Sequence, residues 1–530
     1  MKKLGLYLIE ALAAQGVRHV FGIPGVHNLE LYRGLAGGPI RHVTGRHEQG
    51  LGFMADGYAR LSGRPGVCFT ITGPGLTNIT TAMGQAYGDS IPLLVISSQN
   101  RRGEAGSGRG FLHELPDQRA LASGVAAASF AIAEPGQLPD ALGRAFSMFA
   151  SARPRPVYIE IPLDVLAADA TGLELPASGP PAPVPPATAL DAVADRLRSA
   201  KHPVVLAGGG AIRAAVEARR LVEHLGAPLV MTANARGLLP PGHPLAVPMS
   251  PSLAPVRALI AAADVVLAVG TELGPTDYDM YSVSDFPAPP GLIRLDIDAG
   301  QLTRNALPAI PLCGEAGATL RALLARNLGA QRPGAGAAAA ASAREQALAA
   351  LSPVMQRHVA LLDRIRDALP AAVLVGDSTQ LVYAGNLGFA AATPGSWFNS
   401  ATGYGTLGFA LPASTGASLA APDRPIVCLV GDGGLQFSLG ELAVPGDVGA
   451  WTAIVVWNNR GFGEIKSAMI AAGIAPEGVD VRPPEFAPLA RAYGYAHRVI
   501  EDPAALERAL KDFGMRRQVV LLEVRAGAFE

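Results

Sequence analysis

Two short motifs in the last third of the chain combine residue types that can hold a metal ion and a phosphate-bearing ligand. One apolar run leads into Gly431-Asp432-Gly433-Gly434, and a second leads into Asn458-Asn459-Arg460-Gly461. Glycines let a bulky anion approach the backbone, and free amides at a helix start attract it. Asp432, Asn459 and the carbonyl of Gly461 could provide three oxygens to Mg²⁺, with phosphate and water completing the shell. The alternative is that the first motif is only a tight turn.

The elements that must position these motifs form a repeated pattern. Short β-branched apolar runs alternate with longer helical patterns, and such runs are typical of parallel strands covered on both faces. The expected strands are residues 67–71, 93–96, 204–207, 228–231, 265–269, 292–295, 372–375, 426–430 and 453–457. The sequence therefore predicts an α/β fold of consecutive doubly wound parallel sheets, with ligands at the carboxyl ends of the strands.

Two composition shifts divide the chain into three segments. Residues 176–188 are rich in proline, which neither donates a backbone hydrogen bond nor continues a helix, and residues 332–344 are rich in glycine and alanine. We expect both stretches to be linkers. The predicted domains are residues 1–175, 189–331 and 345–530.

Composition narrows the class of protein. The 530 residues carry a net charge of −1, so no charge excess points to nucleic acid or to a membrane surface, and no apolar run is long enough to span a bilayer. Hydrophobic residues make up 49% and charged residues 16%, which excludes a disordered chain. Cys68, Cys313 and Cys428 form no closely spaced pair, which is typical of a reducing compartment. We expect a soluble, multidomain protein of the cytoplasm.

The two motifs, taken together, resemble the thiamin diphosphate signature, in which a Gly-Asp-Gly is followed by Asn-Asn. Residues 20–25, 46–50 and 73–78 resemble the pyrimidine-binding domain of the acetolactate synthase and 2-oxoacid decarboxylase group. Residues 403–409 resemble the segment beneath the cofactor in that group. The resemblance runs through all three segments in order. It implies a pyrimidine-binding, a middle and a diphosphate-binding domain, with thiamin diphosphate and Mg²⁺ as cofactors.

The resemblance also implies roles for single residues. Glu48 would hydrogen-bond N1′ of the aminopyrimidine, Leu407 would support the bent cofactor, and the carbonyl of Gly405 would accept from the 4′-amino group. Ser378 and Thr379 would contact the diphosphate, although each could simply cap a helix. Further expected cofactor contacts are Gly25, Asn78, Gly431, Asp432, Gly433, Gly434 and Asn459, and the expected metal ligands are Asp432, Asn459 and Gly461. Glu48 could alternatively be a surface residue of a helix.

Similar enzymes build this site between two subunits. A homodimer or a dimer of dimers is therefore implied, with Glu48 and Asp432 of one site contributed by different chains. The middle segment lacks counterparts of the flavin-binding loops of acetolactate synthases, and Gly208-Gly209-Gly210 is not a full dinucleotide motif. We therefore do not expect FAD.

The reaction implied by the resemblance is loss of CO₂ from a 2-oxo acid, giving an aldehyde. Val26 stands where decarboxylases of the yeast type have an aspartate, which argues against that branch. His113 falls where several decarboxylases have a histidine, and it could supply a proton near neutral pH. The alternatives are an acetolactate synthase-like carboligase that joins the fragment to a second carbonyl compound, and a non-catalytic protein that kept the fold.

Within the group, residues 21–27, 41–44, 112–116 and 463–466 are most similar to bacterial decarboxylases of 5-guanidino-2-oxopentanoate (2-ketoarginine). A guanidinium end requires a carboxylate, ideally with two hydrogen bonds. Glu114, beside His113, and Glu464, soon after the second motif, are candidates. Glu464, like the nearby Lys466, could instead be an exposed charge on a helix.

Overall fold

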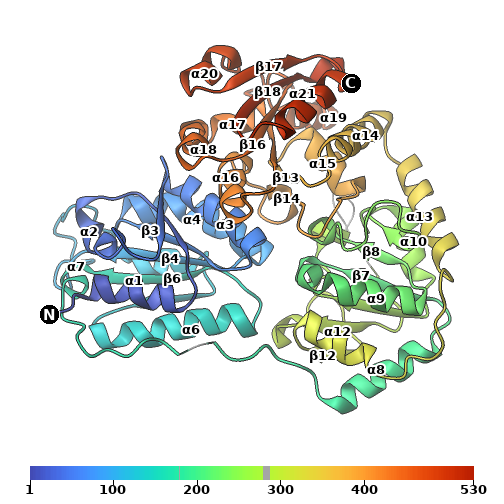
Figure 1. Ribbon diagram of the computed structural model, residues 1–530, viewed down its shortest axis with the longest axis horizontal. Coiled ribbons are helices and arrows are strands. Elements are labelled where there is room, and N and C mark those ends of the chain that lie inside the picture. The colour runs from blue at the N-terminus through green and yellow to red at the C-terminus, as the bar shows by residue number, and fades with distance from the viewer. Residues whose placement is uncertain (178, 279–286, 530) are drawn as a thin grey trace.

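The computed structural model describes residues 1–177, 179–278 and 287–529, and these residues fold around three β-sheets (Figure 1). Each sheet has six strands, and the paired strands within the sheets run parallel. Because parallel strands need long crossover connections, helices separate the strands and cover the sheets. The predicted three-sheet α/β architecture is confirmed.

The first sheet, blue to cyan in Figure 1, has the strand order β2-β1-β3-β4-β6-β5. Its strands are β1 (His19–Gly22), β2 (Arg41–Thr44), β3 (Gly66–Thr70), β4 (Leu93–Gln99), β5 (Ala128–Ala131) and β6 (Val157–Pro162). Its main helices are α1 (Leu4–Ala14), α3 (Glu48–Ser62), α4 (Pro74–Asp89) and α6 (Leu138–Ser151). The central strands β3, β4 and β6 are buried along their whole length, as expected for strands covered on both faces.

The third sheet repeats this connectivity. Its order is β14-β13-β15-β16-β18-β17, which matches the first sheet when the strands are counted along the chain. Its strands are β13 (Val373–Gly376), β14 (Trp397–Asn399), β15 (Ile426–Gly431), β16 (Thr452–Asn458), β17 (Ala496–Ile500) and β18 (Val519–Arg525). Helices α14 (Pro353–Ala368), α15 (Gln380–Gly388), α16 (Ala410–Ala420), α17 (Asp432–Gln436), α19 (Gly463–Ala471) and α21 (Pro503–Gly514) accompany them.

The middle sheet has a different order, β12-β11-β10-β7-β8-β9. It comprises β7 (Pro203–Ala207), β8 (Leu229–Met231), β9 (Ala246–Val247), β10 (Val265–Val269), β11 (Ile293–Asp296) and β12 (Ile310–Cys313). The chain starts at β7 and builds outward in both directions, so β7 and β10 meet at a topological switch point. Ligands of open α/β sheets bind beyond the carboxyl ends of strands at such a point.

The first and third domains touch through α3 and α16. A Cβ placed on Gly57 would lie 2.0 Å from the carbonyl oxygen of Ala413, and one on Gly416 would lie 1.8 Å from that of Met54. Both glycines therefore allow an approach that no larger residue permits. The rings of Phe53 and Phe409 pack edge to face beside them, at 5.3 Å between centroids.

The two predicted linkers differ in structure. Before α8 (Ala187–Ser199) the described part of the proline-rich stretch is irregular, as expected. The second stretch contains the start of helix α13 (Ala337–Ala349), because alanine is the best helix former. Ala340 and Ala347 of this helix are buried against the middle sheet. The predicted domains, residues 1–175, 189–331 and 345–530, stay a proposal, and the boundary at residue 345 falls inside α13.

None of the helices in the described part of the chain combines the length and apolar character needed to cross a bilayer.

Candidate active site

The carboxyl end of β15 delivers a buried carboxylate. The strand ends at Gly431, and Asp432 opens α17 with only 1% of its surface exposed. Its Oδ2 atom has no hydrogen-bond partner among the described residues. Burial raises the pKa of Asp432 to about 6, although nearby backbone amides oppose that shift. A buried carboxylate with a free oxygen is the arrangement that a bound cation would satisfy.

The carboxyl end of β16 places Asn459 against Asp432. The side-chain atom of Asn459 that faces this aspartate lies 3.1 Å from Asp432 Oδ1 and 2.7 Å from the carbonyl oxygen of Gly461. With the amide oxygen in that position, three oxygens converge, and a divalent cation would hold them together. The structure therefore brings the three predicted metal ligands together. In the described ranges, no group of three His, Cys, Asp or Glu side chains offers an alternative metal site.

Glycines let three side chains pack closely against the turn beside this carboxylate. A Cβ on Gly433 would lie 2.7 Å from the ring of Phe462, and one on Gly431 would lie 3.3 Å from Thr379 Oγ1. A Cβ on Gly434 would lie 3.1 Å from Asp377 Oδ2. The missing Cβ atoms therefore allow Phe462, Thr379 and Asp377 to approach the backbone. The turn leads directly into the start of α17, and a diphosphate at this turn stays a prediction.

Polar residues after β13 border the same turn. Asp377 is fully buried and accepts hydrogen bonds from the backbone nitrogens of Ser378 (2.9 Å) and Gly408 (2.8 Å). Burial raises its pKa to about 6, against the effect of those hydrogen bonds. Ser378 Oγ lies 3.3 Å from Ser400 Oγ. Thr379, like Asp377, is buried. The predicted diphosphate contacts Ser378 and Thr379 thus lie beside the glycine turn.

The turn after β14 presents Leu407. Gly405 is exposed, has φ +78°, and donates its backbone N–H to the carbonyl of Ser400 at 3.0 Å. Gly408 also has φ +78°, and a Cβ there would lie 2.7 Å from Phe437. Leu407 is held between these two glycines and remains partly exposed. This geometry fits an apolar support beneath a bound ligand.

Glu48 is positioned on the edge of the first sheet. It follows β2 and opens α3, where the helix dipole favours a carboxylate. Its Oε2 accepts from Nδ2 of Asn78 on α4 at 2.9 Å, and the side chain is partly exposed. Asn78 therefore orients the predicted catalytic carboxyl group, and an adjoining ligand could reach it.

The remaining predicted residues of the first domain share this edge. Gly25 donates its N–H to Asn28 Oδ1 at 2.7 Å, and a Cβ on Gly25 would lie 2.8 Å from Ile71. Val26 follows it with 79% of its surface exposed. His113 lies in the loop after β4, and its ring packs against that of His27.

The two candidate substrate carboxylates differ in their surroundings. Glu114 accepts from the backbone nitrogens of Gly108, Gly110 and Phe111 and from Ser107 Oγ, so it fastens its own loop. Burial would raise its pKa, but these hydrogen bonds lower it. Glu464 is exposed on α19, which contains no buried residue.

One residue at this site was not found from the sequence. Glu441 is 1% exposed, and its Oε1 accepts from the backbone nitrogens of Arg46 (3.0 Å) and His47 (2.8 Å). It therefore caps the start of α3, immediately before Glu48, from the third domain. Nothing in the local sequence connects it with partners almost 400 residues away.

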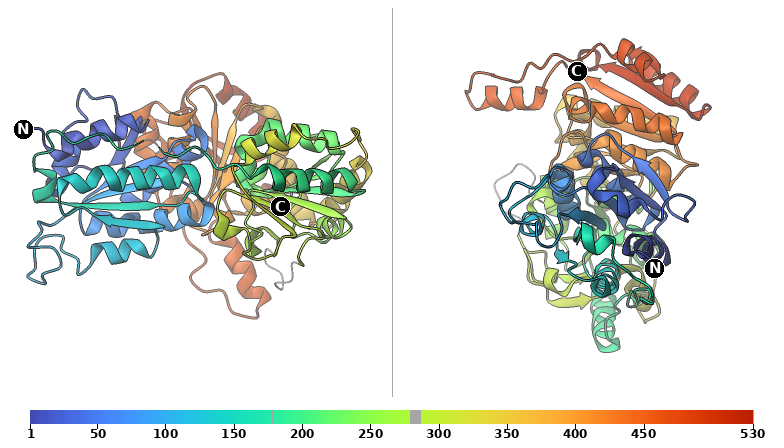
Figure 2. Two further views of the ribbon diagram at one scale, coloured as in Figure 1. Left: turned by 90° about the horizontal axis from the view of Figure 1, so that it is seen from below. Right: turned by 90° about the vertical axis from the view of Figure 1, so that its left-hand side faces the viewer.

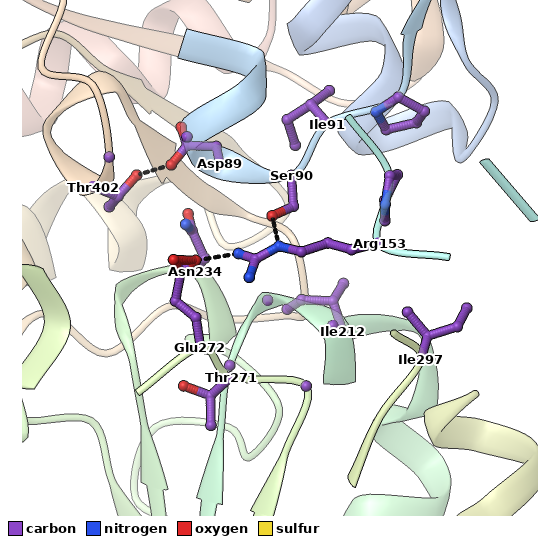
Figure 3. Close-up of a pocket in the computed structure, with 18 of the residues that line it drawn as sticks. Asp89, Ser90, Ile91, Arg153, Ile212, Asn234, Thr271, Glu272, Ile297 and Thr402 are labelled. Atoms are coloured by element: carbon purple, nitrogen blue, oxygen red, sulfur yellow. Dashed lines mark hydrogen bonds and ion pairs between the residues drawn. The ribbon is translucent and has the colours of Figure 1, made fainter. Parts of the chain in front are cut away.

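Apart from the candidate active site, a cavity of about 760 Å³ lies where the three domains meet (Figure 3). Arg153 crosses it, donating to Ser90 Oγ at 2.6 Å and pairing with Glu272 of the middle domain. Thr402 Oγ1 donates to Asp89 Oδ1 at 2.9 Å on another wall. This cavity lies at the carboxyl ends of the middle strands, at the switch point between β7 and β10.

Two backbone amides of the glycine turn after β7 are hydrogen-bonded to residues at the end of β10. The backbone nitrogens of Gly208 and Gly210 donate to the carbonyls of Val269 and Gly270, both at 3.0 Å. These amides are therefore not available to a pyrophosphate, which distinguishes this turn from a dinucleotide-binding loop.

Comparison with known proteins assigns each part of the chain. Models of the thiamine pyrophosphate enzyme family match residues 2–121 (N-terminal TPP binding domain), 190–323 (central domain) and 377–524 (C-terminal TPP binding domain). Thiamine pyrophosphate is another name for thiamin diphosphate. One match falls within each of the three predicted domains, in the predicted order.

Individual relatives extend along nearly the whole chain. The "Probable 2-ketoarginine decarboxylase AruI" of Pseudomonas aeruginosa is 49% identical over 530 residues, which is 98% of this chain and 93% of that protein. The "Acetolactate synthase isozyme 1 large subunit" of Escherichia coli is 31% identical over 86% of this chain and 82% of its own length. A "Probable acetolactate synthase large subunit" of Methanocaldococcus jannaschii is 30% identical over 98% and 90%. The predicted resemblance is confirmed, and the chain belongs to the thiamine pyrophosphate enzyme family.

Proposed function

We propose that this protein is a thiamin diphosphate- and Mg²⁺-dependent decarboxylase that converts a 2-oxo acid, 5-guanidino-2-oxopentanoate, to an aldehyde and CO₂. The observation that carries the proposal is the pair of strand-end sites: Glu48 held by Asn78 on one sheet, and Asp432 with Asn459 on another. The relative named for 2-ketoarginine, 49% identical over 98% of the chain, supports the choice of substrate.

The residues present fit the cofactor and the metal. Asp432, Asn459 and the Gly461 carbonyl would hold Mg²⁺, and the glycine turn with Ser378 and Thr379 would hold the diphosphate. When bound, thiamin diphosphate supplies a carbon nucleophile for the 2-oxo group and a place for the electrons left by CO₂. The protein has to bind it, orient it and move protons.

Glu48 would be the acid–base residue that activates the bound cofactor. Its carboxyl group would share a hydrogen with N1′ of the aminopyrimidine, and Asn78 would keep it turned toward that ring. Leu407 and the Gly405 carbonyl would support the ring in a bent arrangement. Gly25 would be a further cofactor contact, and its missing Cβ lets Ile71 pack against its backbone.

The active site is proposed to lie between two copies of the chain. Helix α19 has no buried residue, and Figure 2 shows it projecting from the rest of the chain. Ile465, Ile470 and Ile474 expose 57%, 60% and 55% of their surfaces in and just after this helix. Such apolar exposure is typical of a face that a partner subunit covers. A homodimer, further assembled as a dimer of dimers, would bury it.

Specificity for a cationic substrate would come from Glu464. Its carboxylate is exposed at the start of α19, whereas that of Glu114 is engaged by its own loop. A guanidinium group pairs well with a carboxylate through two parallel hydrogen bonds. Val26 is exposed just after β1 of the first sheet, and it would border the apolar part of the substrate.

FAD is not part of the proposal, because the amides of Gly208 and Gly210 are already bonded within the middle domain. A cytoplasmic location is proposed from the three unpaired cysteines. An acetolactate synthase-like carboligase is the alternative, and it is supported by the relatives about 30% identical.

A substrate panel tests the proposal. The purified protein, loaded with thiamin diphosphate and Mg²⁺, is given 5-guanidino-2-oxopentanoate, 2-oxohexanoate and pyruvate, and CO₂, aldehyde and acetolactate are measured. The proposal expects the guanidino acid to give aldehyde with the highest kcat/KM. Acetolactate from pyruvate as the fastest reaction would favour the carboligase, and no CO₂ from any substrate would refute both.

The role of Glu464 is tested on the same panel. Glu464→Gln should raise KM for the guanidino acid at least about tenfold, because a charge-assisted pair is lost. It should leave 2-oxohexanoate unaffected. Glu477→Gln, an exposed glutamate further along the same segment, is the control.

A further inference from the structure

Two histidine rings from different strand ends meet at the edge of the first sheet. His27 lies in the 3₁₀ turn Val26–Asn28 after β1, and His113 lies in the loop after β4. Their ring centroids are 5.1 Å apart with an interplanar angle of 71°. Segments far apart in sequence thus bring two imidazoles into direct contact.

The backbone holds His113 in an unfavourable conformation. Its φ of +62° lies in the left-handed region, which costs a non-glycine residue about 1 kcal/mol or more. Asn100 Nδ2 donates to the preceding carbonyl of Leu112 at 3.0 Å, and Thr72 Oγ1 donates to that of His113 at 3.4 Å. A Cβ on Gly73 would lie 2.5 Å from the His113 carbonyl oxygen, so glycine is required beneath it. The strain is maintained by specific contacts that fix the ring beside His27.

Both rings contain a buried nitrogen that the described residues leave unsatisfied. Nδ1 of His27 and Nδ1 of His113 are inaccessible and have no hydrogen-bond partner among those residues. Leaving a buried polar atom unpaired costs about 1–3 kcal/mol, so two such atoms side by side call for an explanation. An imidazole nitrogen with no hydrogen-bond partner remains free to bind and release a proton, as a proton donor must.

The two histidines lie at the same end of the first sheet as Glu48, the residue proposed to contact the cofactor ring. Gly73, which touches the His113 backbone, is the residue before α4, and α4 carries Asn78, the partner of Glu48. Both histidines and Glu48 follow strands whose carboxyl ends form one edge of the same sheet.

We propose that His27 and His113 act together as the proton donor of the decarboxylation, which makes His27 a further catalytic residue. This inference rests on the proposed function. The bond between the 2-oxo carbon and the carboxylate breaks, CO₂ leaves, and the bonding electrons stay with the carbon. A new C–H bond forms there with a proton from the imidazolium N–H, and the neutral imidazole regains a proton from water.

The electrostatics of the pair suit one shared proton. Burial, and then the neighbouring His27, lower the pKa of His113. Glu114, next in the chain, turns its carboxylate to Gly108 and Gly110, and Arg109 lies over the Phe111 ring, so neither is committed to the imidazole. His27 therefore opposes protonation of the His113 ring that it contacts.

Two assays on the holoenzyme separate CO₂ loss from proton delivery. Aldehyde formation needs the proton, whereas CO₂ release with ferricyanide as electron acceptor does not, because oxidation replaces protonation. His27→Gln and His113→Gln should each slow aldehyde formation at least about tenfold and leave ferricyanide-dependent CO₂ release within about twofold of wild type. His19→Gln is the control, because His19 lies at the opposite end of β1 with its ring against Tyr58.

A spectroscopic measurement is independent of turnover. In the full-length chain with ¹⁵N-labelled histidine, His27→Gln should shift the titration of His113 upward, and His19→Gln should not. An unchanged His113 titration, or equal effects of His27→Gln on both assays, overturns the paired donor. A wild-type enzyme that releases no CO₂ in either assay instead overturns the proposed function.

Discussion

At the scale of single residues, the site depends on two carboxylates in different environments. Glu48 is partly exposed and turned by one amide, whereas Asp432 is buried with one oxygen unpaired. In the proposed site, the first would exchange a hydrogen with a ligand, and the second would hold a cation.

Replacing Glu48 should separate binding from turnover. Glu48→Gln keeps a side chain of the same shape that can still bond Asn78, but it cannot act as an acid. We expect CO₂ release to fall by at least about 100-fold, in the range usual for loss of an acid–base group. Binding of thiamin diphosphate, followed by calorimetry, should change little. Glu10→Gln, a surface residue paired with Lys2, is the control, and a fully active Glu48→Gln variant would contradict the assignment.

Replacing Asp432 should remove the response to metal. A ligand at about 100 times its Kd stabilises the folded state by about 2.7 kcal/mol, so Mg²⁺ with cofactor should raise the melting temperature of the wild type. Asp432→Asn should lose that rise, and Asp423→Asn, whose partner is Arg517 at the surface, should keep it. An Asp432→Asn variant that Mg²⁺ still stabilises would show that the cation binds elsewhere.

At the scale of elements, helix α3 depends on a cap that comes from another domain. Glu441 accepts two backbone hydrogen bonds at the start of the helix, and Gly50 leaves room for its carboxylate, since a Cβ there would lie 2.5 Å from Glu441 Oε1. Burial raises the pKa of Glu441, and Glu48 adds to this effect, while the amides of Arg46 and His47 oppose it.

This cap predicts a pH-dependent difference between two variants. Glu441→Gln keeps an accepting oxygen and removes a buried charge, whereas Glu441→Ala strands two amides and should lower stability by about 1–3 kcal/mol. Because the folded-state pKa of Glu441 is raised, its contribution to stability is full below its ordinary pKa and is lost as pH rises through the folded value. The melting temperature of Glu441→Gln relative to wild type should therefore be higher at pH 8 than at pH 5. A difference that shrinks with rising pH would contradict this account.

At the scale of the whole molecule, the three domains are joined by buried polar contacts. Arg236 of the middle domain is 1% exposed, and its guanidinium donates to the carbonyls of Gly385, Asn386 and Phe389 at 2.6–2.8 Å. It thereby pairs with carbonyls at the end of α15 in the third domain and just after it, where a helix leaves its last carbonyls without N–H partners, although the Gly385 carbonyl also accepts from the Phe389 N–H.

Loss of this arginine should loosen the junction. Arg236→Met removes three charge-assisted hydrogen bonds and leaves buried carbonyls unpaired, so we expect a loss of about 3 kcal/mol or more. Calorimetry of the full chain should show an earlier transition. Exposed Arg220→Met should change stability by no more than about 0.5 kcal/mol, and equal melting of the two variants would contradict the role of Arg236.

The sequence was most informative where structure is local. The strands β15 and β16 were predicted because buried parallel strands are continuous apolar runs, and the glycine and asparagine turns mark their ends. Edge strands such as β2 and β17 are short, are mostly exposed and contain several polar residues, so they form no continuous apolar run and were not predicted. The alanine run of α13 was taken for a linker, because its burial depends on the middle sheet. Glu441 and His27 could not be found, since each acquires its partner only through the fold.

The central claim, that one catalytic centre is built from the Glu48 edge of one chain and the Asp432 edge of another, is tested by recombining two inactive proteins. Glu48→Gln and Asp432→Asn variants, each inactive alone, are unfolded together, refolded as a mixture with thiamin diphosphate and Mg²⁺, and assayed for CO₂ release. In a mixed dimer one site has both native carboxylates and the other has neither. Random pairing should thus restore about a quarter of the activity of identically refolded wild type, from the half of the dimers that are mixed. A mixture that contains mixed dimers and stays as inactive as its components would contradict the shared site.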